Sequence, residues 1–177
     1  MAAADIALAL DRAQSILAKR PSAGLHDDAE GVARWAGGTR IVAAHANGHE
    51  VQTDMPAELG GTGDQVSPGW LVRAGVASCA ATCIAMAAAR AGVALEALDV
   101  RVSSRSDTRG VLGMTGEDGA PVPVGPQDLR MRVRIAARGA SAAELRALVE
   151  EGRRLAPMSS LVEGASPMAL SIEIGNA

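Results

Sequence analysis

The sequence predicts an α+β protein built as a single domain. Helical and strand-like segments come in groups instead of alternating one for one, which is typical of α+β folds and not of a doubly wound sheet. The length of 177 residues suits one domain, and a hydrophobic fraction of 48% is enough to bury a core. Within residues 1–177 we expect an N-terminal helix, a first group of strands, a central helix, a second group of strands, and a closing helix and strand, in the ranges 1–20, 31–54, 67–91, 98–137 and 141–177.

Two local signals define the N-terminal third. Ile6, Leu10 and Leu17 recur at helical spacing, and Pro21 ends the helix that they predict. Three short strands follow, and the Asn47-Gly48 pair between the last two is typical of a two-residue hairpin. A glycine-rich loop then leads into the central helix.

The central helix has clear start and stop signals. Ser67 is a preferred N-cap, Pro68 suits the first helical position, and Gly92 is a typical C-terminal stop. One stripe of this helix consists mostly of small side chains, which allow another backbone to approach closely. We therefore expect the helix to be packed on all sides. The stripe comprises Leu71, Gly75, Ser78, Thr82 and Ala85.

The C-terminal half contains further strands and a capped helix. Strands are expected at 98–104, 111–114, 129–135 and 168–174, the first and third from strict alternation of apolar and polar residues. Ser141 with Glu144 three residues later forms a capping-box signature for a helix that ends near Arg154. A short helical segment is expected at Ser159–Glu163.

Composition excludes several classes of function. A net charge of −3 argues against a general nucleic-acid binder, and an aromatic fraction of 1% argues against base-stacking platforms. The apolar run 74–89 is short for a membrane span and consists of small residues, so we expect the buried helix of a soluble protein. A signal peptide begins with positive charge and continues as an unbroken apolar run, whereas here Asp5 and Asp11 come first and Arg12 interrupts the run. We therefore expect a cytoplasmic location, where cysteines stay reduced.

Common cofactor and metal motifs are absent from the sequence. The glycines at 60–63 are not followed by the lysine of a phosphate-binding loop. Ser159-Ser160 lacks the glycine-flanked elbow of a hydrolase. His26, His45 and His49 have no ligand spacing with the cysteines. We therefore expect no cofactor and no metal.

Cys79 and Cys83 lie four residues apart on one face of the central helix. A free cysteine is often a small buried apolar residue, whereas a reactive one needs an electropositive and partly exposed setting. A disulfide between the two within one helix would be strained. The helix alone leaves the structural and the reactive interpretation open.

Residues 54–81, DMPAELGGTGDQVSPGWLVRAGVASCAA, resemble the signature of the OsmC/Ohr family of thiol-dependent hydroperoxide reductases and their relatives. The shared pattern is an acidic-Pro segment, Leu-Gly-Gly-x-Gly, a Ser/Asn-Pro step, and a cysteine eleven residues after that proline. The later order of elements also fits, so the resemblance covers nearly the whole chain. It implies an intertwined α+β homodimer, with a central cysteine-bearing helix packed on antiparallel sheets and the thiol site at the subunit interface.

The resemblance also implies roles for individual residues. Cys79 matches the peroxide-reacting cysteine, whose thiolate attacks the O–O bond and becomes a sulfenic acid. A cation must stabilise the thiolate, because the helix N-terminus is about three turns away. The family uses an arginine from the early strands. Arg40, after Gly37-Gly38, is the best match, and Arg34 is the alternative.

Two positions depart from the family pattern. Gly69 stands where the peroxidases often have a glutamate, and Ala156-Pro157 stands where they have a second cysteine followed by proline. Cys83 cannot easily replace that cysteine, so an external thiol reductant would have to regenerate Cys79 after an organic hydroperoxide has oxidised it. The alternative is a non-catalytic dimer that binds a small apolar ligand in its interface pocket, with Cys79 as a packing residue.

Overall fold

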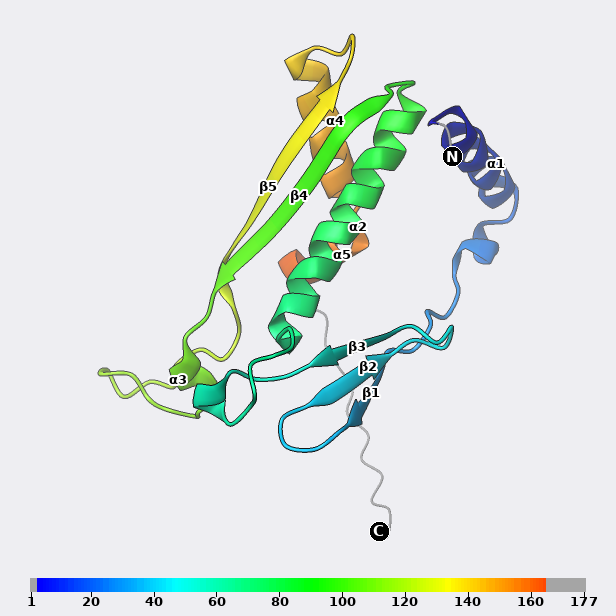
Figure 1. Ribbon diagram of the computed structural model, residues 1–177. Coiled ribbons are helices and arrows are strands. Elements are labelled where there is room, and N and C mark those ends of the chain that lie inside the picture. Colours follow the sequence, from blue (N-terminus) through cyan, green and yellow to red (C-terminus); the bar gives the residue numbers. More distant parts are fainter. Residues whose placement is uncertain (1–2, 165–177) are drawn as a thin grey trace.

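The computed structural model describes residues 3–164 and shows an α+β chain with two antiparallel sheets, which confirms the predicted fold class (Figure 1). The helices are α1 (Ala3–Lys19), α2 (Pro68–Arg90), α3 (Thr108–Val111), α4 (Ala142–Arg154) and α5 (Pro157–Gly164). The strands are β1 (Val32–Trp35), β2 (Ile41–Ala44), β3 (Glu50–Thr53), β4 (Leu95–Arg105) and β5 (Gln127–Ala137). The strand expected at 168–174 lies outside the described residues.

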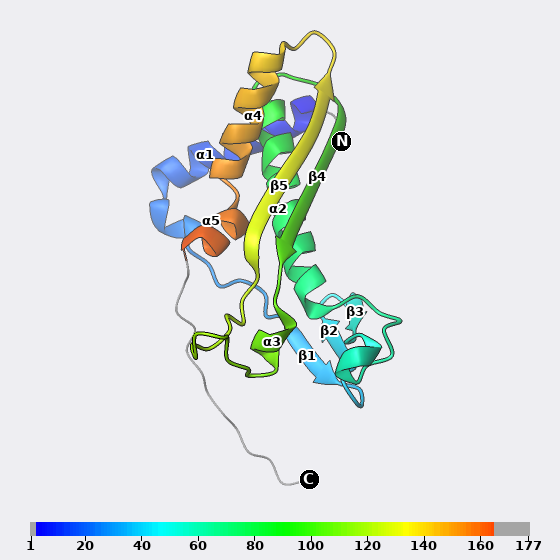
Figure 2. The same cartoon turned by 90° about the vertical axis from the view of Figure 1, so that its left-hand side faces the viewer.

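α2 is the centre of the molecule and contacts α1, α4, α5 and β4 (Figure 2). Ser67 caps it by accepting a hydrogen bond from the backbone N–H of Trp70 at 3.2 Å, as the sequence predicts. Its buried face carries Val76, Ala80 and Ile84. By length and hydropathy α2 could also cross a membrane, but one such helix is weak evidence, because core helices of soluble proteins pass the same test.

The prediction that other elements pack on all sides of α2 is wrong for a single chain. We expected packing on all sides, yet Gly75, Ser78 and Thr82 are exposed. The described elements cover α2 from the other side, so this part of the small-residue stripe faces solvent. Composition indicated that the stripe can be packed closely, but not which element packs on it.

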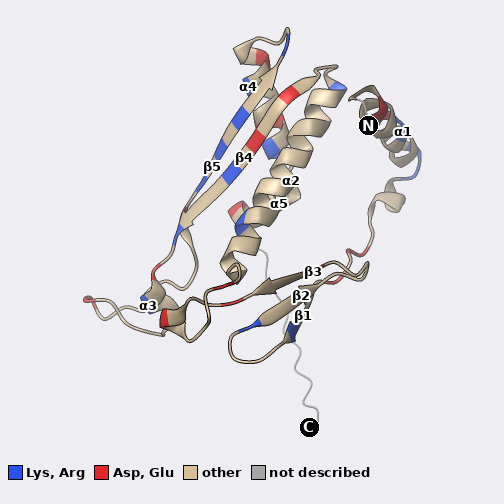
Figure 3. Cartoon of the chain, viewed as in Figure 1, with Lys and Arg blue, Asp and Glu red and all other residues tan. Residues whose placement is uncertain are grey.

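β4 and β5 form a long antiparallel pair in which Val100 lies opposite Val133. Their alternation is as predicted, with apolar side chains on one face and charged ones on the other. The charged face carries a row of exposed arginines, and Arg101 lies directly opposite Arg132 (Figure 3). The apolar face of β4 packs on α2.

The close packing of α4 on α2 depends on a glycine. A Cβ atom added at Gly152 would lie 2.5 Å from the Cα of Ile84, a distance at which one helix would have to move. The predicted capping box starts α4: the Ser141 N–H donates to Glu144 Oε2 at 2.7 Å, and the Glu144 N–H donates to Ser141 Oγ at 3.3 Å. α4 therefore starts at a fixed residue and packs closely on the core.

The strand predicted at 111–114 is wrong. This segment is the end of α3 and the turn after it. The Asp107 side chain caps α3 by accepting a hydrogen bond from the Arg109 N–H at 3.0 Å. Gly110 is buried so close to the backbone of Pro123 that an added Cβ would lie 2.4 Å from its carbonyl oxygen. A local cap and a tertiary contact therefore favour a helical turn over a strand.

The first sheet, with strand order β1-β2-β3, lies apart from β4 and β5 (Figure 1). No residue of β1 or β2 is buried, and Trp35 on β1 is 74% exposed. The sheet is joined to the start of α2 by a bridge between Thr53 and Val66 and by the Asp54 N–H, which donates to the Val66 carbonyl at 3.1 Å. Within the described chain, this sheet is buried only at Thr53, the last residue of β3.

Candidate functional site

The glycine-rich loop between β3 and α2 has a backbone that requires glycine at two positions. Gly60 adopts a left-handed conformation, φ 84°, at the end of a short 3-10 turn over Ala57–Leu59. A Cβ at Gly61 would lie 1.8 Å from the Met55 carbonyl oxygen, so no other residue fits there without movement. The loop consequently folds back on the segment that precedes it.

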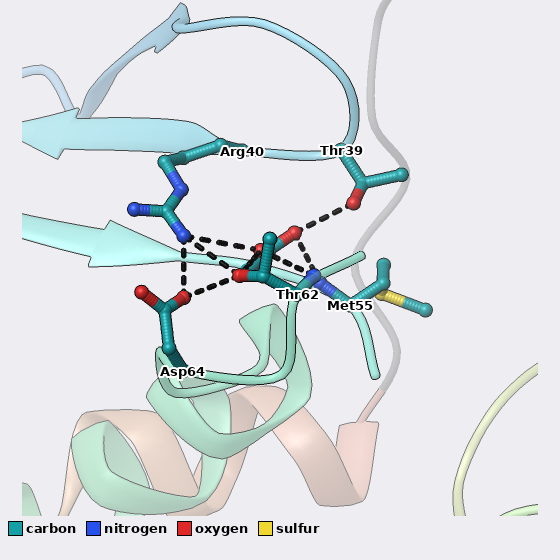
Figure 4. A network of polar contacts seen from close by, with 6 residues as sticks. Thr39, Arg40, Met55, Thr62 and Asp64 are labelled. Atoms are coloured by element: carbon teal, nitrogen blue, oxygen red, sulfur yellow. Dashed lines mark hydrogen bonds and ion pairs between the residues drawn. The ribbon is translucent and has the colours of Figure 1, made fainter. Parts of the chain in front are cut away.

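The folded loop surrounds the carboxylate of Asp54, which is 3% exposed. Asp54 accepts hydrogen bonds from the Thr39 hydroxyl at 2.6 Å, the Thr62 N–H at 3.0 Å and the Met55 N–H at 2.8 Å (Figure 4). The Thr62 hydroxyl lies 2.7 Å from the same carboxylate. These bonds, that of Thr39 first, hold the pKa of Asp54 well below its usual range, although burial opposes the shift.

Arg40 joins this network from the start of β2. Its Nη2 atom donates to Thr62 Oγ1 at 2.8 Å, lies 3.4 Å from Asp54 Oδ2, and forms an ion pair with Asp64 (Figure 4). The Arg40 side chain is 28% exposed. The structure therefore brings this predicted site residue to the glycine loop, between two carboxylates.

Sequence reasoning missed the residues that hold Arg40. Its partners Asp54, Thr62 and Asp64 are not among the predicted site residues. A signal was present, because the two aspartates flank the glycines of the family-like segment and an arginine nearby would offset their charge. The alternative, Arg34, is solvent-exposed on β1 and lies 3.9 Å from Glu50.

Cys79 is half-buried on α2. No hydrogen bond or ion pair joins it to Arg40 within residues 3–164, where the partners of Arg40 are in the glycine loop. A single chain thus does not bring the two predicted site residues together. Whether they act together in catalysis stays a prediction.

Cys83 lies one turn after Cys79. Burial raises the pKa of the Cys83 thiol, and the neighbouring Cys79 raises it further. The Cys83 Sγ donates a hydrogen bond to the Leu155 carbonyl oxygen at 3.6 Å, and Ala156, the next residue, is 1% exposed. The Ala156-Pro157 step, where the resemblance expects a second cysteine, is therefore next to Cys83. Both cysteines are free thiols.

An apolar cavity of about 840 Å³ lies along the N-terminal half of α2. Val72 and Val76 form its wall on α2, and Val102 and Leu129 contribute from β4 and β5. Cys79 follows Val76 by almost one turn without lining the cavity. The volume suits a small organic ligand. In the described part of the chain, no group of His, Cys, Asp and Glu side chains is arranged to hold a metal ion.

Comparisons with known proteins identify the family and the fold of the chain. Residues 61–171 match the model of the family described as OsmC-like protein. No curated protein matches the chain. Among solved structures, an OsmC-like protein from Mycoplasma pneumoniae aligns with a TM-score of 0.65 and 15% identity, covering 80% of this chain and 91% of that one.

Two further solved structures are similar in fold. An organic hydroperoxide resistance protein OsmC from Legionella pneumophila has a TM-score of 0.58 and 22% identity, covering 79% of this chain and 92% of its own. An organic hydroperoxide resistance protein from Elizabethkingia anophelis has a TM-score of 0.54 and 19% identity, with coverages of 80% and 91%. With the family match over most of its length, a cysteine in register on the central helix and this shared fold, the chain belongs to the OsmC-like family.

Proposed function

We propose that the protein is a thiol-dependent reductase of organic hydroperoxides in which Cys79 is the single reactive cysteine. The observation that carries this proposal is the position of Cys79, which keeps its register with the glycine loop and Pro68 in a chain that belongs to the OsmC-like family. Two structural neighbours are named organic hydroperoxide resistance proteins. The adjacent apolar cavity suits the organic part of such a substrate.

In the proposed reaction the Cys79 thiolate attacks the terminal oxygen of the hydroperoxide. A new S–O bond forms as the O–O bond breaks, the leaving alkoxide takes up a proton, and an alcohol and a sulfenic acid result. One molecule of an external dithiol, or two of a monothiol, then reduces the sulfenic acid to the thiol and releases water and a disulfide. We propose a cytoplasmic location, where such thiols are available.

We also propose that the active form is a homodimer. Two surfaces favour it: the exposed part of the small-residue stripe of α2, and a first sheet that, within residues 3–164, is buried only at Thr53. A second copy packed on both would bury these surfaces. The contact would allow Arg40 of one copy to approach the thiol of the other, where it would stabilise the thiolate.

The consumption of cumene hydroperoxide in the presence of a dithiol tests the reductase proposal. Wild-type protein should consume the peroxide, and Cys79→Ser should abolish the protein-dependent rate. Cys83→Ser is the matched control, because it removes the neighbouring thiol from the same helix, and it should retain activity. Equal rates for wild type and Cys79→Ser would overturn the proposal.

The cavity also supports a second candidate, a dimer that binds a small apolar ligand without catalysis. Gly69 and Ala156 favour it, since they stand where the peroxidases carry groups that assist the reaction. The rate of alkylation at pH 6 distinguishes the two, because an ordinary cysteine has a pKa of about 8.5 and reacts slowly there. Rapid alkylation that Cys79→Ser removes favours the reductase, and slow alkylation favours the binding protein.

A further inference from the structure

Two charged side chains, Arg73 and Asp107, line the cavity beside α2, and within residues 3–164 only Asp107 forms an ion pair. Asp107 is paired with Arg109, whose Nη2 lies 2.6 Å from Oδ2 and whose Nε lies 3.0 Å from Oδ1. Arg73 Nη1, in contrast, donates a hydrogen bond to the neutral Ser104 hydroxyl at 3.4 Å. No ion pair of Arg73 is described within residues 3–164. The cavity therefore holds one positive charge without a counter-ion.

This positive charge is set in apolar surroundings. Arg73 is half-buried, and the cavity walls near it are largely aliphatic. An ion pair with a ligand is stronger in such a place than at an open surface, because less water screens it. The aliphatic walls include Leu59, Val72, Val76, Val102, Val124 and Leu129.

Gly69 leaves room beside this guanidinium. It lines the cavity one turn before Arg73, and a Cβ added there would lie 3.5 Å from the Arg73 Nη1 atom. A glutamate at this position would stand at i, i+4 from the arginine, the spacing at which carboxylates pair with cations along a helix. With glycine, the chain supplies no such carboxylate, and a ligand can supply it instead.

We propose that this cavity binds an amphipathic monocarboxylate, with its carboxylate on Arg73 and Ser104 and its hydrocarbon chain along the aliphatic walls. A planar guanidinium suits a carboxylate because it can donate two parallel hydrogen bonds. This assignment goes beyond the proposed reductase: carboxylate binding at Arg73 does not depend on peroxide reduction by Cys79. Failure of the one therefore leaves the other standing.

Calorimetric titration of the full-length protein with octanoate and with 1-octanol tests the proposal. Octanoate should bind more tightly than the neutral alcohol of the same length. Arg73→Gln should weaken octanoate binding by roughly tenfold or more, the usual range for a lost hydrogen bond to a charged group, and leave 1-octanol unchanged. Arg73→Lys should retain part of the preference for the acid.

Substitutions at Gly69 supply a second and independent arm. Gly69→Glu places a carboxylate beside Arg73 and should weaken octanoate binding about as much as Arg73→Gln does. Gly69→Gln is the matched control, equal in size but uncharged, and should bind octanoate more tightly than Gly69→Glu. Far-UV circular dichroism and thermal unfolding check that each variant is folded.

Three results would overturn the assignment. One is equal affinity of the wild-type protein for octanoate and 1-octanol. Another is octanoate binding that folded Arg73→Gln leaves unchanged. The third is no binding of octanoate at millimolar concentration, as expected if a protein segment or a second copy fills the cavity. Peroxide consumption by the same samples reports separately on Cys79.

Discussion

At the scale of single residues, the buried Asp54 carboxylate determines how the glycine loop is built. Its hydrogen bonds come from both sides of the loop and from the turn before β2. They favour the charged form, so the pKa of Asp54 in the folded protein lies below its unfolded value. Stability is thereby linked to pH.

We predict that Asp54 makes the protein sensitive to acid. Its stabilising contribution is complete above the unfolded pKa of about 4 and is lost as the pH falls from there towards the lower folded pKa. Asp54→Asn should therefore be less stable than wild type at pH 7, with a free energy of unfolding that changes less between about pH 4 and pH 2. Urea denaturation at pH 7 and between about pH 4 and pH 2 measures the stability at neutral pH and its change with acid.

Asp27→Asn is the control for this prediction, since Asp27 is exposed and no hydrogen bond of its side chain is described within residues 3–164. It should follow the wild-type curve. If the free energy of unfolding falls equally with pH for wild type and Asp54→Asn, the Asp54 carboxylate is not the source of the acid sensitivity.

The partners of Arg40 show why the site was harder to predict than the fold. A glycine loop, a proline and a cysteine in fixed register are local signals, and the sequence displays them directly. The pairing of Arg40 with Asp54 and Asp64 depends on how the loop folds back, which the steric requirement at Gly61 decides. Arg73 was missed because only the folded chain shows that its charge faces a cavity.

At the scale of elements, the contact between α2 and α4 depends on the missing side chain of Gly152. We predict that Gly152→Ala lowers the free energy of unfolding by about 1–3 kcal/mol, the usual cost of overpacking a core. The added methyl group would lie 2.5 Å from the Ile84 Cα, so the helices must separate. Chemical denaturation monitored by circular dichroism gives the value.

A second glycine provides the comparison. Gly31→Ala adds the same methyl group in the segment before β1, where nothing lies within 4 Å of it. It should leave stability unchanged or raise it slightly, because alanine restricts the unfolded chain. A loss as large as that of Gly152→Ala would show that the close helix contact is not the cause.

Element prediction succeeded where the signals are local. The caps at Ser67 and Ser141 and the alternation along β4 and β5 were read correctly, because each depends on residues a few positions apart. It failed at 111–114, where the cap from Asp107 and the close approach of Gly110 to Pro123 decide the conformation. The exposure of one side of α2 could not be predicted either, because composition does not show where neighbouring elements lie.

At the scale of the whole molecule, part of α2 and most of the first sheet are left uncovered within residues 3–164. We predict a stable homodimer with twice the 17.9 kDa mass of the chain by light scattering. Ser78→Arg should convert it to a monomer, because a long cationic side chain would replace a hydroxyl in the exposed part of the small-residue stripe.

Ser103→Arg is the matched control, since it places the same side chain on the exposed outer face of β4 and should leave the dimer intact. A monomeric wild-type protein would overturn the dimer proposal. A Ser78→Arg variant that stays dimeric would show that the interface lies elsewhere.

The network around Asp54 has a consequence for how the molecule opens. Thr39 and Arg40 belong to the β1–β2 hairpin, whereas Thr62 and Asp64 belong to the loop before α2, so the Asp54 carboxylate and the Arg40 guanidinium together connect the two segments. Such segments tend to open as one cooperative unit. The amide hydrogens of β2 and of the glycine loop should then exchange with solvent at a common rate, and that rate should increase together in both segments when the carboxylate is protonated.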